Sequence, residues 1–366
     1  MEQQILTLNG EYSALAAFLS AQGWRKVLLV CDSAYRFLKI STFLDNLTSP
    51  AFVRFDRFQP NPRYESVVEG VSVLRENGCD AILAIGGGSA IDVAKCIKLY
   101  AYLDPAQNYL RQPVVPNDLP LTAMPTTAGT GSEATRFAVI YYEGEKQSVA
   151  DPSIIPSTVL FDASALKTLP EYQKKSTMLD ALCHAVESSW SVHATEESRA
   201  YAAQAIRAVL GAKDAYLANT DAGNAAMLRA ANLAGKAINI TQTTAGHAMC
   251  YKLTSLYGAA HGHAAALCVR RLWPWMLAHT DRCIDPRGEA YLQSVFAELA
   301  GLFGADTPEA GAARFNQLFD ELALPVPTLR ESDLPVLSGS VNPVRLKNNP
   351  VSLEGEIPAL YRAILR

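Results

Sequence analysis

The apolar residues in the first half of the chain follow two alternating patterns, which constrain the fold more than any other feature. Short runs rich in Val, Ile and Leu, at Lys26–Asp32 and Leu119–Thr127, indicate buried strands. The segment Tyr64–Gly78 has the spacing of an amphipathic helix, and Asp80–Leu103 has the order strand, glycine loop, helix. Strands that alternate with helices predict a parallel sheet covered by helices on both faces.

The pattern changes near Ser164. From there, alanine-rich helical patterns such as Lys174–Val192 and Glu197–Ala218 dominate, and β-branched runs become scarce. The sequence therefore predicts two domains, an α/β domain over residues 1–163 and an all-α domain over residues 164–366. Because no flexible linker separates them, we expect a rigid pair with a cleft between the domains, which is a favoured place for a ligand.

Composition and charge exclude several classes of function. Of the 366 residues, 49% are hydrophobic and 19% are charged, and the formal net charge is −4, so neither nucleic acid nor a membrane surface is expected as a partner. We find no signal-peptide pattern and no apolar run long enough to cross a bilayer. The seven cysteines are irregularly spaced without a CxxC pair, which predicts reduced thiols in a cytoplasmic protein.

A glycine loop lies between a predicted strand and a predicted helix. It contains Gly86, Gly87, Gly88 and Ser89. Glycine lets a backbone approach a phosphate closely, and the helix that follows offers free N–H groups and a positive dipole end. A tight turn without a ligand is the alternative, but three consecutive glycines favour phosphate binding. The loop is neither GxGxxG nor a P-loop, so it does not identify the ligand that carries the phosphate.

A second loop of small and hydroxylic residues, Met124–Thr135, also follows a predicted strand. Thr126, Thr127 and Thr130 offer hydroxyl donors there. Two such loops fit a ligand with two phosphates and two riboses. Asp32, at the end of the first clear strand, is placed to accept hydrogen bonds from a ribose and to repel a 2′-phosphate. An ordinary capping aspartate is the alternative for this residue.

Four residues of the second half form a candidate metal site. Asp180 and His184 lie four apart on a predicted helix and share one face, as metal ligands or as a hydrogen-bonded core pair. His247 and His261 would lie about 21 Å apart on a straight helix, so they meet only if the helix breaks, for which Gly258 is suited. Together the four side chains give one oxygen and three nitrogens, a set that suits Fe²⁺ or Zn²⁺.

The motifs GGGSAIDVAK, PTTAGTGSEAT, DALCHAVES and HGHA occur in this order along the chain. In order and spacing they resemble the iron-containing (group III) alcohol dehydrogenases over essentially the whole chain, including the ending NNPVSLEGEIPALYRAIL. The resemblance implies a dehydroquinate synthase-like fold, in which an N-terminal dinucleotide-binding α/β domain precedes an all-α domain. The active site would lie in the cleft between them.

The resemblance also implies an NAD-dependent alcohol dehydrogenase or aldehyde reductase, with NADP as the alternative cofactor and homodimerisation as the family expectation. One divalent ion, Fe²⁺ or Zn²⁺, would polarise the substrate oxygen for hydride transfer. Its ligands would be Asp180, His184, His247 and His261. The residues implied in cofactor binding are Asp32, Gly86, Gly87, Gly88, Ser89, Asp92, Thr126, Thr127, Thr130 and Lys146.

The chain departs from the family pattern near the expected substrate. Many members have a proton-transferring histidine four residues after the position of His247, and here Tyr251 stands there. The candidate relays are therefore Tyr251, a water molecule or the nicotinamide ribose. Lys252 and Arg345, with hydroxylic neighbours, suggest a small anionic aldehyde or alcohol as substrate, because guanidinium pairs well with phosphonate, phosphate or carboxylate. The combination looks like the branch that reduces phosphonoacetaldehyde to 2-hydroxyethylphosphonate. Solvated surface charge is the alternative for Arg345.

Three other functions are weighed against this one. A generic short-chain alcohol or diol dehydrogenase would share every motif except the charged residues. A non-redox cyclase or lyase of the dehydroquinate synthase type would share the fold and the glycine loops, but its metal set resembles one Glu with two His. A binding protein with an inactive site is the third alternative, and the four filled ligand positions speak against it.

Overall fold

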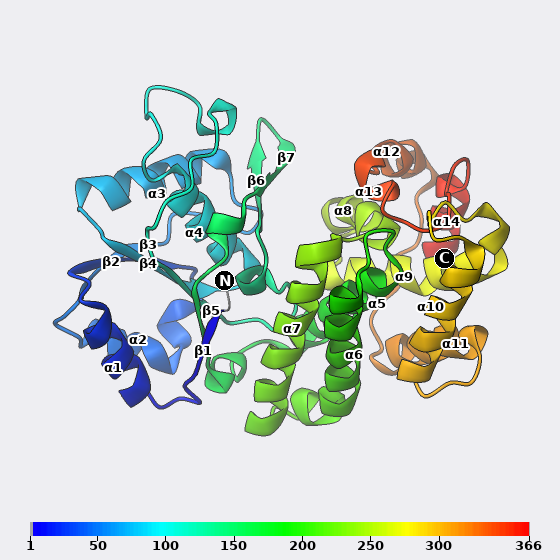
Figure 1. Cartoon of the computed structure of the whole chain (residues 1–366), viewed down its shortest axis with the longest axis horizontal. Coiled ribbons are helices and arrows are strands. Elements are labelled where there is room, and N and C mark those ends of the chain that lie inside the picture. Colours follow the sequence, from blue (N-terminus) through cyan, green and yellow to red (C-terminus); the bar gives the residue numbers. More distant parts are fainter. Residues whose placement is uncertain (1–2, 366) are drawn as a thin grey trace. The chain divides into compact units, whose positions relative to one another are not determined.

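The computed structural model describes residues 3–365 and divides into two compact units (Figure 1). The first unit runs to Leu169 and takes in Asn219–Leu228. The second comprises Pro170–Ala218 and the chain from Arg229 onward. The domain boundary expected between residues 163 and 164 stays a prediction.

The first unit is built on a parallel sheet of six strands in the order β1-β8-β5-β4-β2-β3. From one edge to the other these strands are β1 (Gln4–Thr7), β8 (Thr158–Phe161), β5 (Leu121–Pro125), β4 (Ala81–Gly86), β2 (Lys26–Cys31) and β3 (Ala51–Phe55). The helices of this unit that flank the sheet are α1 (Ser13–Gln22), α2 (Lys39–Asp45), α3 (Tyr64–Glu76) and α4 (Gly88–Tyr100). The predicted strands and helices of the first half are therefore confirmed.

Side chains alternate across the sheet and create two apolar layers. Val27 and Leu29 of β2 belong to a buried cluster with residues of α1 and α2, whereas Leu28 and Val30 belong to a cluster with α3 and α4. Figure 1 shows these helix pairs on opposite faces of the sheet. Successive side chains of a strand point to opposite faces of the sheet. Because helices cover both faces, the residues of such a run are apolar on both sides.

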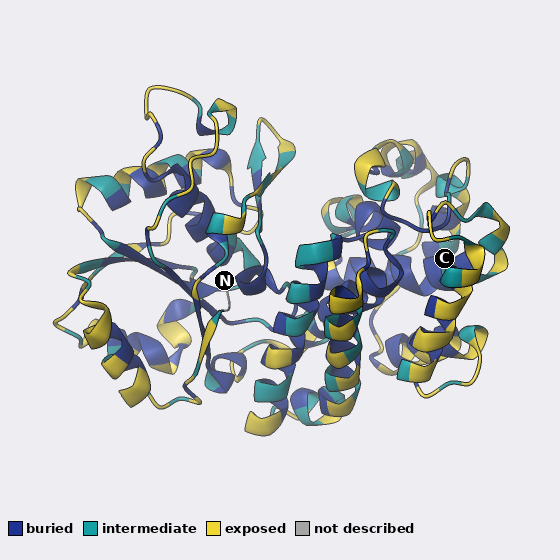
Figure 2. Cartoon of the chain, in the orientation of Figure 1, coloured by how far each residue is buried: buried dark blue, intermediate teal, exposed yellow. Residues whose placement is uncertain are grey.

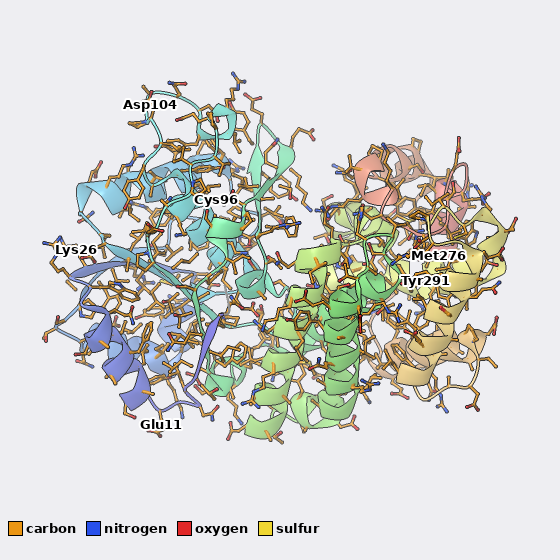
Figure 3. The ribbon with its side chains drawn as sticks, in the orientation of Figure 1. Glu11, Lys26, Cys96, Asp104, Met276 and Tyr291 are labelled. Atoms are coloured by element: carbon orange, nitrogen blue, oxygen red, sulfur yellow. The ribbon has the colours of Figure 1, made fainter. Side chains whose placement is uncertain are left out.

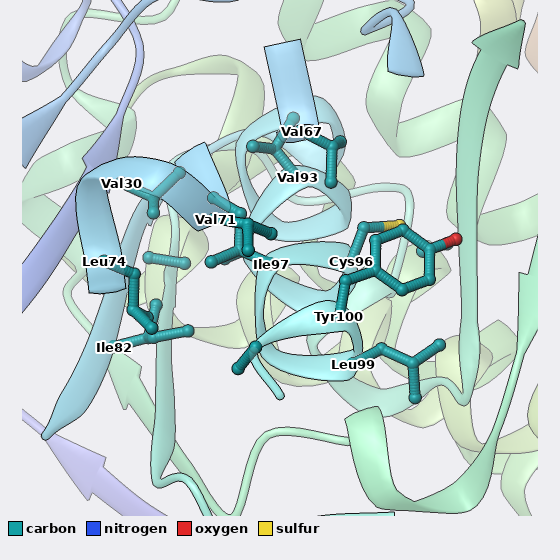
Figure 4. Packing of buried hydrophobic residues seen from close by; sticks show 14 of the residues in the cluster. Val30, Val67, Val71, Leu74, Ile82, Val93, Cys96, Ile97, Leu99 and Tyr100 are labelled. Carbon is teal, nitrogen blue, oxygen red and sulfur yellow. The ribbon is translucent and has the colours of Figure 1, made fainter. Parts of the chain in front are cut away.

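The packing of α3 on α4 is close. In Figure 4, Val71 of α3 lies beside Ile97 of α4. A Cβ on Gly70 would lie 2.9 Å from Cγ1 of Ile97 and 3.0 Å from Cε1 of Phe55, so a glycine is needed at this contact. This contact matters for function because α4 follows the glycine loop.

A two-stranded antiparallel hairpin, β6 (Phe137–Tyr142) and β7 (Glu145–Ala150), was not predicted from the sequence. Its turn is Glu143–Gly144, where both residues have positive φ, 53° and 81°. Positive φ at both central residues is the geometry of a tight two-residue hairpin turn. The hairpin carries Lys146, which pairs with Tyr141 across the two strands.

The second unit is helical, as predicted, and within residues 3–365 no strand begins after β8. The helices of this half, of which α7 starts in the first unit, are α5 (Glu171–Trp190), α6 (Glu196–Leu217), α7 (Asp221–Thr241), α8 (Ala245–Tyr257), α9 (His261–Ala278), α10 (Glu289–Leu302), α11 (Pro308–Glu321), α12 (Leu334–Gly339), α13 (Pro343–Leu346) and α14 (Ile357–Ile364). Figure 2 shows α5 buried along most of its length, whereas α6 alternates between buried and exposed residues. The two helices thus differ in burial. Because α5 is an interior helix, its polar side chains need hydrogen-bond partners within the protein.

All seven cysteines are free, as expected, and six of them are buried. Figure 3 shows Cys96 inside the first unit and Asp104 in the exposed loop after α4. Among the described helices, none is both long and apolar enough to cross a membrane.

Candidate active site

Helix α5 supplies the first two groups of the candidate metal site. Asp180 and His184 are both buried and lie one helical turn apart on the same face. His184 Nε2 is 3.9 Å from Asp180 Oδ1. The ring of His184 also stacks on that of His247, with centroids 4.4 Å apart and planes 13° from parallel.

The predicted break between the other two histidines is present. Helix α8 ends at Tyr257, Gly258 caps it in the left-handed conformation with φ 71°, and α9 begins at His261. This turn brings the two histidines to one point. His247 Nε2 is 3.3 Å and His261 Nε2 is 3.9 Å from the same Oδ1 of Asp180.

The geometry fits a transition-metal ion. In a tetrahedral site with bonds of about 2.1 Å, neighbouring donor atoms lie about 3.4 Å apart. The Nε2 atoms of His247, His261 and His184 lie 3.3, 3.9 and 3.9 Å from Asp180 Oδ1, but His184 falls outside the tighter group of three ligands. Ligand atoms of Asp180, His247 and His261 all lie within 4.8 Å of one another. The side chain of His261 is 43% exposed, whereas the other groups are buried, so the cluster is open to solvent on one side. Catalytic metal sites need such an opening.

The charges in the cluster support each other. Burial alone raises the pKa of Asp180, but the surrounding imidazoles outweigh it and hold this pKa well below its usual range. Burial alone lowers the pKa of His247, but the charge of Glu187 and hydrogen bonds to both carboxylates raise it to about 9. The imidazoles therefore offset the negative charge of Asp180 and Glu187, and a bound cation would do the same.

Gly262 allows α9 to approach α5 closely enough to form the cluster. A Cβ at this position would lie 2.5 Å from Cβ of Asp180 and 2.9 Å from its N, and still closer to the carbonyl oxygen of Ser176. Only a residue without a side chain fits here. The sequence showed this glycine beside His261, but gave no sign of its contact with α5.

The start of α9 is anchored by hydrogen bonds. The Tyr172 hydroxyl accepts from the Ala260 N–H at 2.9 Å and hydrogen-bonds His263 Nδ1 at 3.1 Å. The N–H of His263 donates to Ser176 Oγ at 3.0 Å. These contacts give His263 a structural role, and they hold the first turn of α9, which carries His261, in place.

Sequence reasoning gave no role to Glu187, which lies fully buried against His247. The available signal was its spacing: Glu187 follows Asp180 by two helical turns and therefore shares its face of α5. Burial raises the pKa of Glu187, but the charge and hydrogen bonds of His247 outweigh it and lower this pKa.

Tyr251 lies beside the exposed ligand candidate. Its ring stacks on that of His261, with centroids 5.9 Å apart and planes 14° from parallel. Cys250 Sγ lies 3.6 Å from His261 Nδ1. The candidate relay thus stands next to the cluster, one turn of α8 after His247, and its part in proton transfer stays a prediction.

The two predicted substrate residues are placed differently. Arg345 on α13 is half-buried, and its Nη1 donates to Gln242 Oε1 at 2.5 Å. Gln242 joins α7 to α8 and has positive φ, 59°. The following residue, Thr243, accepts a hydrogen bond from Asn348 Nδ2 at 3.1 Å, which ties the α13 segment to the start of α8. Lys252 is exposed on α8.

In the first unit, the glycine loop lies where β4 meets α4. A Cβ on Gly86 would lie 2.6 Å from Cβ of Ala90 and 2.8 Å from Oδ2 of Asp32, so a larger residue would not fit. The Gly87 N–H points at the same Oδ2 over 3.4 Å. Asp32 directly follows β2, the parallel neighbour of β4, and its Oδ1 accepts the N–H of Ala34. The carboxylate therefore borders the loop and also caps a turn.

The hydroxyl loop lies on the other side of the glycines. Thr126 N–H donates to Gly86 O at 3.0 Å, since β5 pairs with β4. Thr130 closely faces Gly88, where a Cβ would come within 3.0 Å of Thr130 Cγ2, and Thr127 faces the preceding glycine. Ser89 lies in the first turn of α4. The structure thus brings both predicted loops together at the carboxyl ends of the neighbouring strands β4 and β5.

Asp92 serves the architecture of this site. Its Oδ1 accepts from Ser132 Oγ at 2.6 Å and its Oδ2 from the Val139 N–H at 2.9 Å. Burial raises the pKa of Asp92 despite the opposing charges of Lys95 and Lys146. The carboxylate therefore joins α4 to the hydroxyl loop and to β6, and a direct contact with a cofactor stays a prediction, as it does for Lys146.

Lys95, which sequence analysis passed over, is fully buried one turn after Asp92. Its Nζ donates to Ser132 Oγ, Thr135 O and Phe137 O at 3.2, 2.7 and 2.8 Å. Burial lowers the pKa of Lys95 to about 8, against the charge of Asp92. Lys95 therefore binds the end of the hydroxyl loop and the first residue of β6, and these hydrogen bonds hold the two segments together.

The family is established by comparison with known proteins. Residues 3–163 match the family described as iron-containing alcohol dehydrogenase. Residues 174–335 match the C-terminal part of the Fe-containing alcohol dehydrogenase family. This chain therefore belongs to the iron-containing alcohol dehydrogenases, and the enzyme class expected from the motifs is confirmed.

Individual relatives act on different substrates. The chain is 33% identical over 307 residues to the phosphonoacetaldehyde reductase of Streptomyces viridochromogenes, covering 80% of this chain and 78% of the relative. It is 35% identical over 267 residues to an NAD-dependent methanol dehydrogenase of Bacillus methanolicus, covering 69% of each. The sulfoacetaldehyde reductase of Bifidobacterium kashiwanohense, solved in complex with NAD+, has the same fold, with a TM-score of 0.87, 24% identity and coverage of 99% and 96%.

Proposed function

We propose that this enzyme reduces phosphonoacetaldehyde to 2-hydroxyethylphosphonate with NADH and one divalent metal ion. The observation that carries the proposal is the convergence of three histidines on one buried carboxylate in a family named for iron. The similarity to a phosphonoacetaldehyde reductase over most of both chains supports the substrate.

The four residues that would hold the ion are Asp180, His184, His247 and His261. When bound, the ion supplies Lewis-acid polarisation of the substrate oxygen, and the nicotinamide supplies the hydride. The chain's own part is to present one oxygen and three nitrogens in a fixed arrangement and to leave one side open. Tyr251 would pass a proton to the developing alkoxide from its place beside His261.

The dinucleotide would bind at the carboxyl edge of the sheet. Glycines 86 to 88 and the first turn of α4 would hold the pyrophosphate, because a helix N-terminus and a bare backbone favour an anion. Asp32 would accept hydrogen bonds from the adenosine ribose. That the two parts face each other across a cleft, and that the enzyme forms a homodimer in the cytoplasm, remain predictions.

We expect Asp32→Ser to change the preference between NADH and NADPH. Removing the carboxylate beside Gly87 removes its repulsion of a 2′-phosphate, so kcat/KM with NADPH should rise relative to NADH by roughly tenfold, or about 1.4 kcal/mol. The measurement is kcat/KM with each dinucleotide at a fixed aldehyde concentration. Asp104→Ser, in the exposed loop after α4, is the matched control and should leave the ratio unchanged. An unchanged ratio in Asp32→Ser would remove Asp32 from the ribose site.

Arg345 is the residue that would bind the anionic head of the substrate. Its guanidinium is held by Gln242 at the loop that leads into α8, which carries His247. A guanidinium carries five N–H donors in a fixed fork and can pair bidentately with a phosphonate. Lys252 is exposed on the same helix, so its role is the less supported of the two.

We expect the enzyme to oxidise NADH faster with phosphonoacetaldehyde than with propanal, which lacks the anionic group. In Arg345→Ala, KM for phosphonoacetaldehyde should rise about 10- to 100-fold, as loss of a charge-assisted hydrogen bond of about 1.5–3 kcal/mol implies. Propanal should be almost unaffected. Lys347→Ala, an exposed cation on the same segment, is the matched control. Equal kcat/KM for both aldehydes in the wild type would contradict the phosphonate substrate.

The second candidate is a generic short-chain alcohol or diol dehydrogenase, favoured by the similarity to a methanol dehydrogenase. It predicts that neutral aldehydes are reduced as well as the phosphonate. A non-redox cyclase or lyase is the least supported alternative. It predicts no net NADH consumption with any aldehyde, so the same assay decides among the three.

A further inference from the structure

Glu187 has no solvent exposure and is surrounded by donors. Its Oε2 is hydrogen-bonded to His247 Nδ1. Its Oε1 accepts from three groups, the Thr244 hydroxyl at 2.6 Å, the Thr244 N–H at 3.1 Å and the His247 N–H at 3.2 Å. Three donors to Oε1 favour the ionised carboxylate, whose Oε2 can then accept from His247 Nδ1.

Trp190 fixes which atoms donate in these hydrogen bonds. Trp190 Nε1 can only donate, and it donates to Thr244 Oγ1 at 3.0 Å. The hydroxyl proton of Thr244 is then directed to Glu187. Because the three donors to Oε1 stabilise the carboxylate form of Glu187, we assign the proton of the Oε2–Nδ1 contact to His247.

The consequence reaches the metal cluster. Nε2 of His247 faces Asp180 Oδ1 at 3.3 Å. If a cation takes the place of the proton between these two atoms, His247 keeps its proton on Nδ1, and the lone pair of Nε2 becomes a metal ligand. A carboxylate behind an imidazole ligand fixes its tautomer and orientation and raises its basicity. Glu187 also provides a second buried negative charge, so two carboxylates would balance a divalent cation.

The space for this carboxylate is provided by Gly246. A Cβ there would lie 3.0 Å from Glu187 Oε1 and 2.7 Å from Cγ2 of Val269. The glycine one residue before His247 therefore lets the start of α8 lie over the carboxylate. The glycine in the sequence, the backbone of α8 and the contacts of Glu187 are therefore consistent with a carboxylate placed against His247.

We propose that Glu187 is a positioning residue that holds His247 as the Nδ1–H tautomer and thereby makes its Nε2 a metal ligand. The proposal rests on the metal centre of the proposed function. It assigns Glu187 no contact with substrate, cofactor or metal.

The test is Glu187→Gln, which keeps the shape of the side chain. An amide has one acceptor and one donor end, whereas the surroundings supply donors at both oxygens. If its oxygen faces Thr244, its NH₂ meets His247 Nδ1 and moves the ring proton to Nε2. If the amide is flipped, the NH₂ meets three donors. Either arrangement disturbs the ligand.

We expect chelator-stripped Glu187→Gln to bind Zn²⁺ about 10- to 100-fold more weakly than the wild type in a chelator competition. ¹⁵N NMR of the zinc-loaded proteins should show Nδ1–H for His247 in the wild type and a changed pattern in the variant. Asp285→Asn, a buried carboxylate paired with Arg287, is the matched control and should keep zinc affinity. A Glu187→Gln protein that folds and binds zinc like the wild type would overturn the proposal.

Thr244→Val tests the same chain of hydrogen bonds with the carboxylate retained, and decides the matter if Glu187→Gln does not fold. It removes the hydroxyl that directs Glu187, so zinc affinity should fall in the same direction by a smaller factor. Unchanged affinity and unchanged ¹⁵N shifts in a folded Thr244→Val protein would then overturn the proposal. If the wild type itself binds no zinc, the metal centre of the proposed function fails, and this inference fails with it.

Discussion

Replacing Gly262 by alanine is expected to separate α9 from α5 and to abolish metal retention. The new Cβ would lie 2.5 Å from Cβ of Asp180 and closer still to the backbone oxygen of Ser176. Because backbone atoms cannot rotate away, the helices must move apart, which we expect to lower the free energy of unfolding by about 1–3 kcal/mol. His261, the first residue of α9, would move with its helix away from the cluster.

The measurements are metal content per chain after purification and the thermal unfolding midpoint. Gly211→Ala is the matched control, because Gly211 lies within α6 and a Cβ there has no neighbour within 4 Å. That substitution should stabilise the protein by up to about 1 kcal/mol, since alanine favours a helix over glycine. A Gly262→Ala protein with full metal content and an unchanged midpoint would refute the close contact between the helices.

The second large effect is expected for Asp180→Asn. Asp180 Oδ1 is the atom on which the three histidines converge, and its charge is the part of the donor set that most favours a cation. We expect loss of the bound metal and a fall of kcat/KM by roughly 10³-fold or more, about 4 kcal/mol of transition-state stabilisation.

Metal analysis and steady-state NADH oxidation measure this effect. Asp162→Asn is the control, since Asp162 is equally buried but accepts from Gly10, Tyr12 and Ser164 in the first unit and faces no imidazole among these partners. It should lower stability and leave metal content unchanged. An active, metal-replete Asp180→Asn enzyme would show that the histidine cluster is not the catalytic centre.

The fold of this chain was predictable where one local pattern decided the outcome. The run at Lys26–Asp32 became β2, because an apolar run covered on both faces suits a central parallel strand. The break at Gly258 was predictable for a similar reason, since glycine readily takes the left-handed conformation that ends a helix. The hairpin that carries Lys146 was missed, because its turn needs positive φ at Glu143, which the residue type does not indicate.

The candidate site was only partly predictable. The types and spacing of Asp180 and His184 indicated a shared helix face, and a break at Gly258 allowed His247 and His261 to complete a donor set. The family resemblance implied the same four ligands. The buried Glu187 and Lys95 were missed, because a charged residue in a helical pattern is usually a solvated one. Their partners, Thr244 and Thr135, lie 57 and 40 residues away in sequence.

The sequence by itself determined the alternation of strands and helices in the first half, the helical second half, the glycine and hydroxyl loops and the chemical types of the metal-binding groups. Only the tertiary structure decided which atoms meet. Asp180 and His247 are 67 residues apart, and they come together because α9 rests on α5 at Gly262 and α8 rests on Glu187 at Gly246. Periodicity reports which face of an element is buried, whereas the partner on that face depends on packing between distant segments.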